Sequence, residues 1–109
     1  MENIPVTRGI FEGLRVVELA LYAAVPTTAR VLASMGAEVI VIQSNTAIDE
    51  SWLPPPWGSG LIIRNRLVTK KSASLNVRKP GAHQILKELI CISDVFMTNL
   101  GIETLKSWG

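Results

Sequence analysis

The sequence predicts an α/β protein with an open, mostly parallel, Rossmann-like sheet flanked by helices. Residues 13–43 read as strand, loop, helix, turn and strand, which is one βαβ unit. Residues 39–42 (VIVI) form the continuous apolar run typical of a parallel strand buried on both faces. The alternation then continues as a long loop, a strand, a helix, a strand and a helix. We therefore expect one domain over residues 1–109, with right-handed crossovers.

In the first unit we expect a strand at Arg15–Leu19, a helix at Pro26–Met35 and a strand at Glu38–Ile42. Adjacent valines favour the first strand. Pro26 suits the first turn of a helix, where its missing N–H has no partner to lose. Gly36 suits the left-handed position just after a helix.

The second half begins with a long connection at Ser44–Gly60, in which three consecutive prolines exclude a central strand. Leu61–Val68 is interpreted as a short helix or turn, and Ser72–Val77 as the third strand. A helix follows Lys79. Its predicted buried positions, at helical spacing, are Ala82, Ile85, Leu86, Leu89 and Ile90. The fourth strand is expected at Asp94–Met97 and a last helix at Glu103–Trp108.

The usual strand order for this alternation, 3-2-1-4, reverses between the first and fourth strands. Ligands of open α/β sheets bind at such a reversal, beyond the carboxyl ends of the strands. The loops there are Ala20–Val25 and Thr98–Gly101, which we expect to share one crevice. The first loop has no glycine, so the dinucleotide-binding fingerprint is absent.

Composition restricts the possible functions. Apolar residues make up 48% of the chain and charged residues 18%, which favours a packed core and some apolar surface covered by self-association or another chain. No apolar run reaches membrane-spanning length. Cys91 and His83 are the only cysteine and histidine, so we expect no disulfide, no metal site and a reducing, cytoplasmic setting.

Six of the eleven basic residues lie between Arg64 and Lys79, and no acidic residue lies between Ser51 and Lys87. Three interpretations stay open: a solvated loop, a site for a phosphorylated small molecule, or a nucleic-acid surface. The last is the least favoured, because interleaved aromatic residues are missing.

Several polar residues near the predicted crevice have two interpretations each. Tyr22 stacks on a ligand or packs in the protein. Glu18, inside a strand, is either catalytic or paired with a basic or backbone group, and pairing is favoured. Asn99 contacts a ligand or forms an Asx turn.

Four segments carry a family pattern: GLRVVEL at 13–19, MGAEVIVI at 35–42, TKKSASLNV at 69–77 and SDVFMTN at 93–99. In order and spacing, over about residues 11–109, they resemble the N-terminal part of family III CoA-transferases. That group includes formyl-CoA, carnitine and phenyllactate CoA-transferases and the α-methylacyl-CoA racemases. Its pattern is roughly GxxVxxL, LGAEVIKIE, N-x-x-K-[KR]-S-x-x-L-[DN]-[LM] and ADVxxxN.

The resemblance implies that coenzyme A or an acyl-CoA is the substrate, with no covalently bound cofactor. The CoA-binding positions carry over to Tyr22, Ala23 and Ala24 in the first loop, to Lys70 or Lys71, and to Asn99. Lysine side chains suit the phosphates of CoA.

The chain also departs from the family. Residues 40–44 (IVIQS) lack the lysine and carboxylate of the family's IKIE segment, and Ser107 stands where the family has an arginine. The family's catalytic aspartate lies downstream of the matched region. We therefore expect an N-terminal fragment or stand-alone relative without catalytic residues of its own. A non-catalytic, self-associating or partner-binding module without CoA affinity is the alternative.

Overall fold

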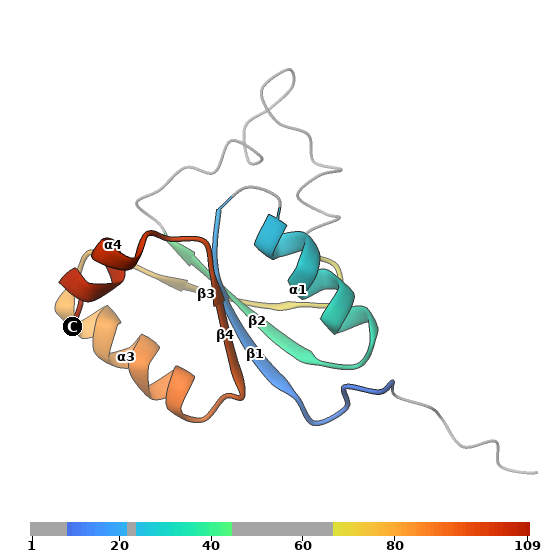
Figure 1. The fold of residues 1–109 in the computed structure, drawn as a ribbon. Helices are drawn as coiled ribbons and strands as arrows, with labels where there is room; N and C mark the ends of the chain where they lie inside the picture. The colour runs from blue at the N-terminus through green and yellow to red at the C-terminus, as the bar shows by residue number, and fades with distance from the viewer. Residues whose placement is uncertain (1–8, 22–23, 45–66) are drawn as a thin grey trace, which may run out of the picture.

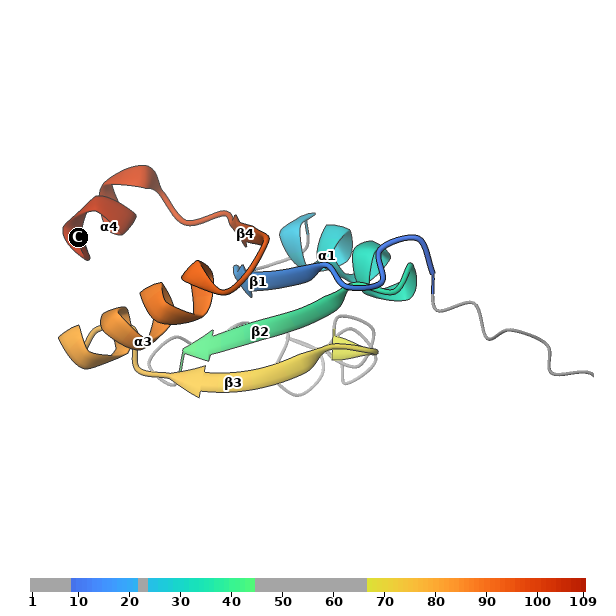
Figure 2. The ribbon, with the colours of Figure 1, turned by 90° about the horizontal axis from the view of Figure 1, so that it is seen from below.

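The computed structural model describes residues 9–21, 24–44 and 67–109 of the chain. Its centre is a four-stranded, fully parallel sheet made of β1 (Arg15–Leu19), β2 (Glu38–Ser44), β3 (Lys71–Leu75) and β4 (Val95–Thr98). The strand order is β3-β2-β1-β4, as Figure 2 shows, which confirms the predicted order and the open α/β fold.

Helices cover both faces of the sheet. Figure 1 shows α1 (Ala24–Ser34) on one side, with α3 (Pro80–Cys91) and α4 (Ile102–Ser107) on the other. Side chains alternate between the faces of a strand, so neighbouring residues of β1 enter different cores. Val16 packs with Ala29 of α1, whereas Val17 packs with Leu86 of α3.

Element boundaries differ from the predicted ones by one or two residues. The helix α1 begins at Ala24, so Pro26 sits third in the helix, still within the turn where an N–H has no helical partner. The strand β3 runs from Lys71 to Leu75, because Asn76 Oδ1 accepts a hydrogen bond from the Arg78 N–H and turns the chain. Ser44, predicted to begin the long connection, ends β2 instead. Residues 45–60 of that connection and residues 61–66 of the next segment lie outside the described residues.

The buried face predicted for α3 is wrong at one position. Ala82 and Leu86 are buried and Leu89 and Ile90 are half-buried, but the Ile85 side chain is 54% exposed. The sheet covers a narrower stripe of the helix than the apolar pattern indicates.

Gly36 ends α1 as predicted, in the left-handed region with φ 103°. The Ala37 N–H donates to the Leu32 carbonyl and the Gly36 N–H to the Ala33 carbonyl, which is the Schellman pattern. The tight turn sets where β2 begins beside β1.

We expect Gly36→Ala to lower the free energy of unfolding by roughly 1 kcal/mol, because an L side chain is strained at this φ. Urea unfolding measures the difference. Gly81→Ala is the matched control, since an added Cβ there meets nothing within 4 Å and φ is not positive. It should leave stability unchanged or raise it. Equal losses in both variants would contradict this account of Gly36.

A candidate ligand site at the carboxyl edge of the sheet

The segments that follow β1 and β4 meet at the carboxyl edge of the sheet. Asn99 Oδ1 accepts a hydrogen bond from the Leu21 N–H at 3.0 Å, and Asn99 Nδ2 donates to the Leu21 carbonyl at 2.5 Å. The amide thus pairs with Leu21 much as a strand residue would, beyond the last register pair, Leu19 with Thr98. We call this contact between Leu21 and Asn99 the carboxyl-edge junction. It shows that the two predicted crevice loops are neighbours.

The Asn99 side chain therefore does not form the Asx turn that was the alternative interpretation, because it bonds to the backbone of Leu21 in another loop. The local turn is made by its neighbour: Thr98 Oγ1 accepts a hydrogen bond from the Leu100 N–H at 3.1 Å. Asn99 is exposed, although its side chain is bonded to Leu21.

The loop after β1 leads directly into α1. Ala24 is the first residue of the helix and is exposed. Tyr22 and Ala23 lie outside the described residues. Ala24 and Asn99 therefore mark the parts of the predicted site that the structure places near the loop between β1 and α1.

Glu18 and Lys70 form a buried ion pair behind this loop. Their Oε2 and Nζ atoms are 2.8 Å apart, and the side chains are only 2% and 1% exposed. Lys70 Nζ also donates to the Pro26 carbonyl of α1 at 2.8 Å. The expected pairing of Glu18 is confirmed, and its partner is a predicted CoA-binding residue.

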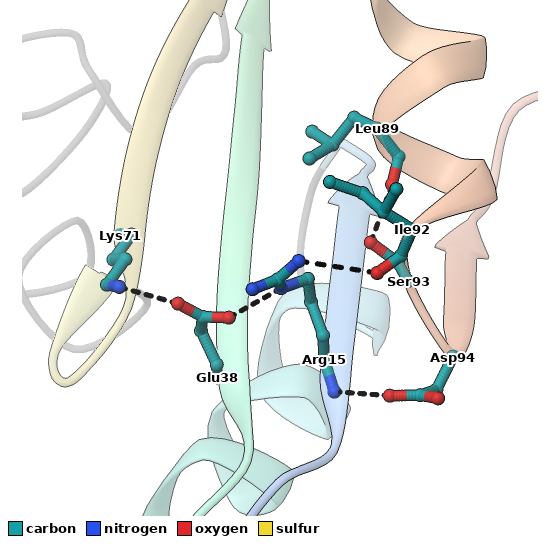
Figure 3. Close-up of polar contacts among 7 residues, drawn as sticks. All are labelled: Arg15, Glu38, Lys71, Leu89, Ile92, Ser93 and Asp94. Carbon is teal, nitrogen blue, oxygen red and sulfur yellow. Dashed lines mark hydrogen bonds and ion pairs between the residues drawn. The ribbon is translucent and has the colours of Figure 1, made fainter.

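Lys71 lies at the opposite edge. It begins β3, and the amino ends of parallel strands share the edge away from the carboxyl-edge junction. Its Nζ contacts Glu38 Oε1 at 2.5 Å, and Glu38 Oε2 accepts from Arg15 Nε at 2.6 Å (Figure 3). The structure therefore separates Lys71 from Asn99, while Lys70 reaches the start of α1.

The amino-edge network of Arg15, Glu38 and Lys71 joins three strands and continues to the fourth. The Arg15 N–H donates to Asp94 Oδ2 at 2.8 Å, and its guanidinium reaches the Ile92 carbonyl at 3.3 Å (Figure 3). Sequence analysis missed this network. The sequence does carry a signal for it: Arg15 and Glu38 have opposite charges and begin neighbouring strands. The register of β1 and β2 places them side by side.

Two other kinds of site receive no support in the described part of the chain. Residues 9–21, 24–44 and 67–109 hold no group of three His, Cys, Asp or Glu side chains placed to bind a metal ion. Within the same ranges, no helix is long and apolar enough to cross a membrane.

The fold and the junction define the class: an open parallel α/β domain with a loop contact at its strand-order reversal. Residues 11–109 match the family described as CoA-transferase family III, and the chain belongs to this family.

Two relatives and one solved structure illustrate the match. The chain is 32% identical to the succinyl-CoA–L-malate CoA-transferase beta subunit of Chloroflexus aurantiacus, over 89% of this chain and 25% of the relative. It is 37% identical to mouse succinyl-CoA:glutarate CoA-transferase, over 81% and 21%. A CAIB/BAIF family protein from Brucella suis superposes with a TM-score of 0.80 at 26% identity, covering 92% and 28%. The chain thus spans about a quarter of these relatives.

The amino-edge network predicts a pH dependence of stability. Hydrogen bonds from Lys71 and then Arg15 lower the pKa of Glu38 from 4.5 to about 2. Because the folded-state pKa is depressed, the stabilisation is present above pH 4.5 and is lost as the pH falls toward 2. Glu38→Gln should lower stability at pH 7 by at most about 1 kcal/mol, since the Glu38 side chain is 33% exposed and screened by solvent.

Thermal unfolding from pH 7 to pH 2 measures this difference, which should shrink below pH 4.5. The control is Glu103→Gln, which removes the exposed Glu103–Lys106 pair of α4 and should have a smaller effect at pH 7. A Glu38→Gln deficit that stays constant down to pH 2 would show that the carboxylate charge is not its source.

Proposed function

We propose that this chain forms the CoA-receiving front part of a family III CoA-transferase. The complete enzyme transfers CoA between a CoA thioester and a carboxylic acid. The observation that carries the proposal is the carboxyl-edge junction, which joins the two loops at the strand-order reversal where open α/β sheets bind ligands.

The proposed site combines the loop before α1 with Asn99. Small residues at Ala23 and Ala24 let a ligand approach the backbone, and free N–H groups at the start of α1 suit an anionic phosphate, although Pro26 supplies none. By the family pattern, Tyr22 and Asn99 belong to the same proposed site, together with Lys70 or Lys71. The distances favour Lys70 over Lys71 as the lysine that supports the site, because Lys70 Nζ contacts the Pro26 carbonyl in the first turn of α1.

The reactants are proposed only as classes. The two relatives named above take succinyl-CoA as one reactant, and we extend to this chain only a CoA thioester and a carboxylic acid. CoA is a substrate here, and no prosthetic group is proposed.

The setting and assembly are proposed on the same basis. The single cysteine suits a reducing cytoplasm. The sheet edges at β3 and β4 suit coverage by a second copy or another chain.

Isothermal titration calorimetry with CoA tests the ligand site. We expect the wild-type chain to bind CoA, and Asn99→Ala to bind about tenfold more weakly, because losing both hydrogen bonds to Leu21 loosens the loop (about 1.4 kcal/mol). Gln84→Ala is the matched amide control on α3, where the exposed Gln84 Nε2 donates a hydrogen bond to Glu88 Oε1. It should bind like the wild type.

Absence of heat from the wild-type chain at millimolar CoA would sink the proposed ligand site and favour the partner-binding alternative. Wild-type affinity in Asn99→Ala would move the site away from the carboxyl-edge junction.

A further inference from the structure

The Lys70 ammonium has no free access to a ligand in this structure. Its side chain is 1% exposed and lies 2.8 Å from both Glu18 Oε2 and the Pro26 carbonyl. Glu18 neutralises its charge. A phosphate that drew Lys70 away would leave a buried carboxylate unpaired, which is strongly unfavourable.

A backbone turn precedes β3, and the Lys70 side chain that follows it is buried. Thr69 has φ 66°, the one positive φ among the described residues other than glycine. The Lys70 N–H donates to the Leu67 carbonyl at 3.2 Å, closing a turn around Thr69. A β-branched residue in this conformation is strained, and such strain persists only where surrounding contacts enforce it.

The contacts of Lys70 fall at the two ends of the loop that follows β1. Glu18 lies in β1, three residues before Leu21 of the carboxyl-edge junction. Pro26 lies in the first turn of α1. One buried ammonium therefore links β1 directly to the first turn of α1.

We propose that Lys70 is a positioning residue, which with Glu18 holds the first turn of α1 against β1 and does not itself contact a CoA phosphate. The effect on CoA rests on the proposed function. The effect on α1 does not, because it concerns the unliganded chain.

CoA titration separates positioning from direct contact, because the two roles predict opposite changes of CoA affinity in Glu18→Gln. If Lys70 positions the start of α1, Lys70→Met and Glu18→Gln should both weaken CoA binding, by tenfold or more. If Lys70 binds a phosphate directly, Lys70→Met weakens binding but Glu18→Gln strengthens it, because the ammonium loses its competing anion. Lys87→Met, which removes an exposed lysine of α3, is the control and should bind as the wild type does. A gain of affinity in Glu18→Gln overturns the proposal.

Amide hydrogen exchange without CoA gives an independent readout. In Lys70→Met and Glu18→Gln, the amides of α1 should exchange at least tenfold faster, while those of α3 keep their wild-type rates. Unchanged exchange in α1 overturns the proposal even if CoA binding changes. If the wild-type chain binds no CoA, the proposed function fails, and the exchange result alone still decides the role of Lys70.

A double variant separates positioning from loss of folding. Glu18→Leu with Lys70→Met removes both charges together, so no unpaired charge stays buried, and the fold should persist by circular dichroism. The Pro26 carbonyl still loses its outside donor, so α1 should exchange faster than in the wild type. Wild-type exchange in a folded double variant would show that Lys70 holds nothing in place.

Discussion

The placement of β1 between β2 and β4 determines most of this structure. All three strands are parallel, and right-handed crossovers to opposite sides of β1 pass over opposite faces of the sheet. The helix α1 therefore covers one face, and α3 with α4 covers the opposite one (Figure 1). The loops after β1 and β4 are left together at the carboxyl edge, where Asn99 pairs with Leu21. The meeting of these two segments is a consequence of the strand order.

The two edges of the sheet use charge differently. At the amino edge, Arg15, Glu38 and Lys71 form a partly exposed network that joins neighbouring strands (Figure 3). Near the carboxyl edge, Glu18 and Lys70 form a pair removed from water. Burial makes this second pair sensitive to the loss of either partner, because a single charge left there has no solvent to stabilise it. An exposed network tolerates such a loss better, since water replaces the missing partner.

The structure shows that lysines of the basic cluster in the sequence pair with different carboxylates. Lys70 and Lys71 are neighbours in the chain, yet one binds Glu18 beneath α1 and the other binds Glu38 at the amino edge. Their positive charges are thus largely matched within the domain. Arg78 and Lys79 are exposed in the turn after β3, so they fit the solvated-loop interpretation in the described part of the cluster. The electropositive character read from the sequence therefore overstates the charge available to a ligand.

The sequence by itself determined the elements, their order and the family. Hydrophobic periodicity, Pro26 and Gly36 are local signals, and local signals place strands and helices to within one or two residues. It also identified Asn99 and Glu18 as polar residues worth attention. Only the tertiary structure decided what they contact. Asn99 meets Leu21 and Lys70 meets Glu18 across separations of 78 and 52 residues. Strand register and the packing of one element on another select such partners, and neither is encoded by spacing along the chain.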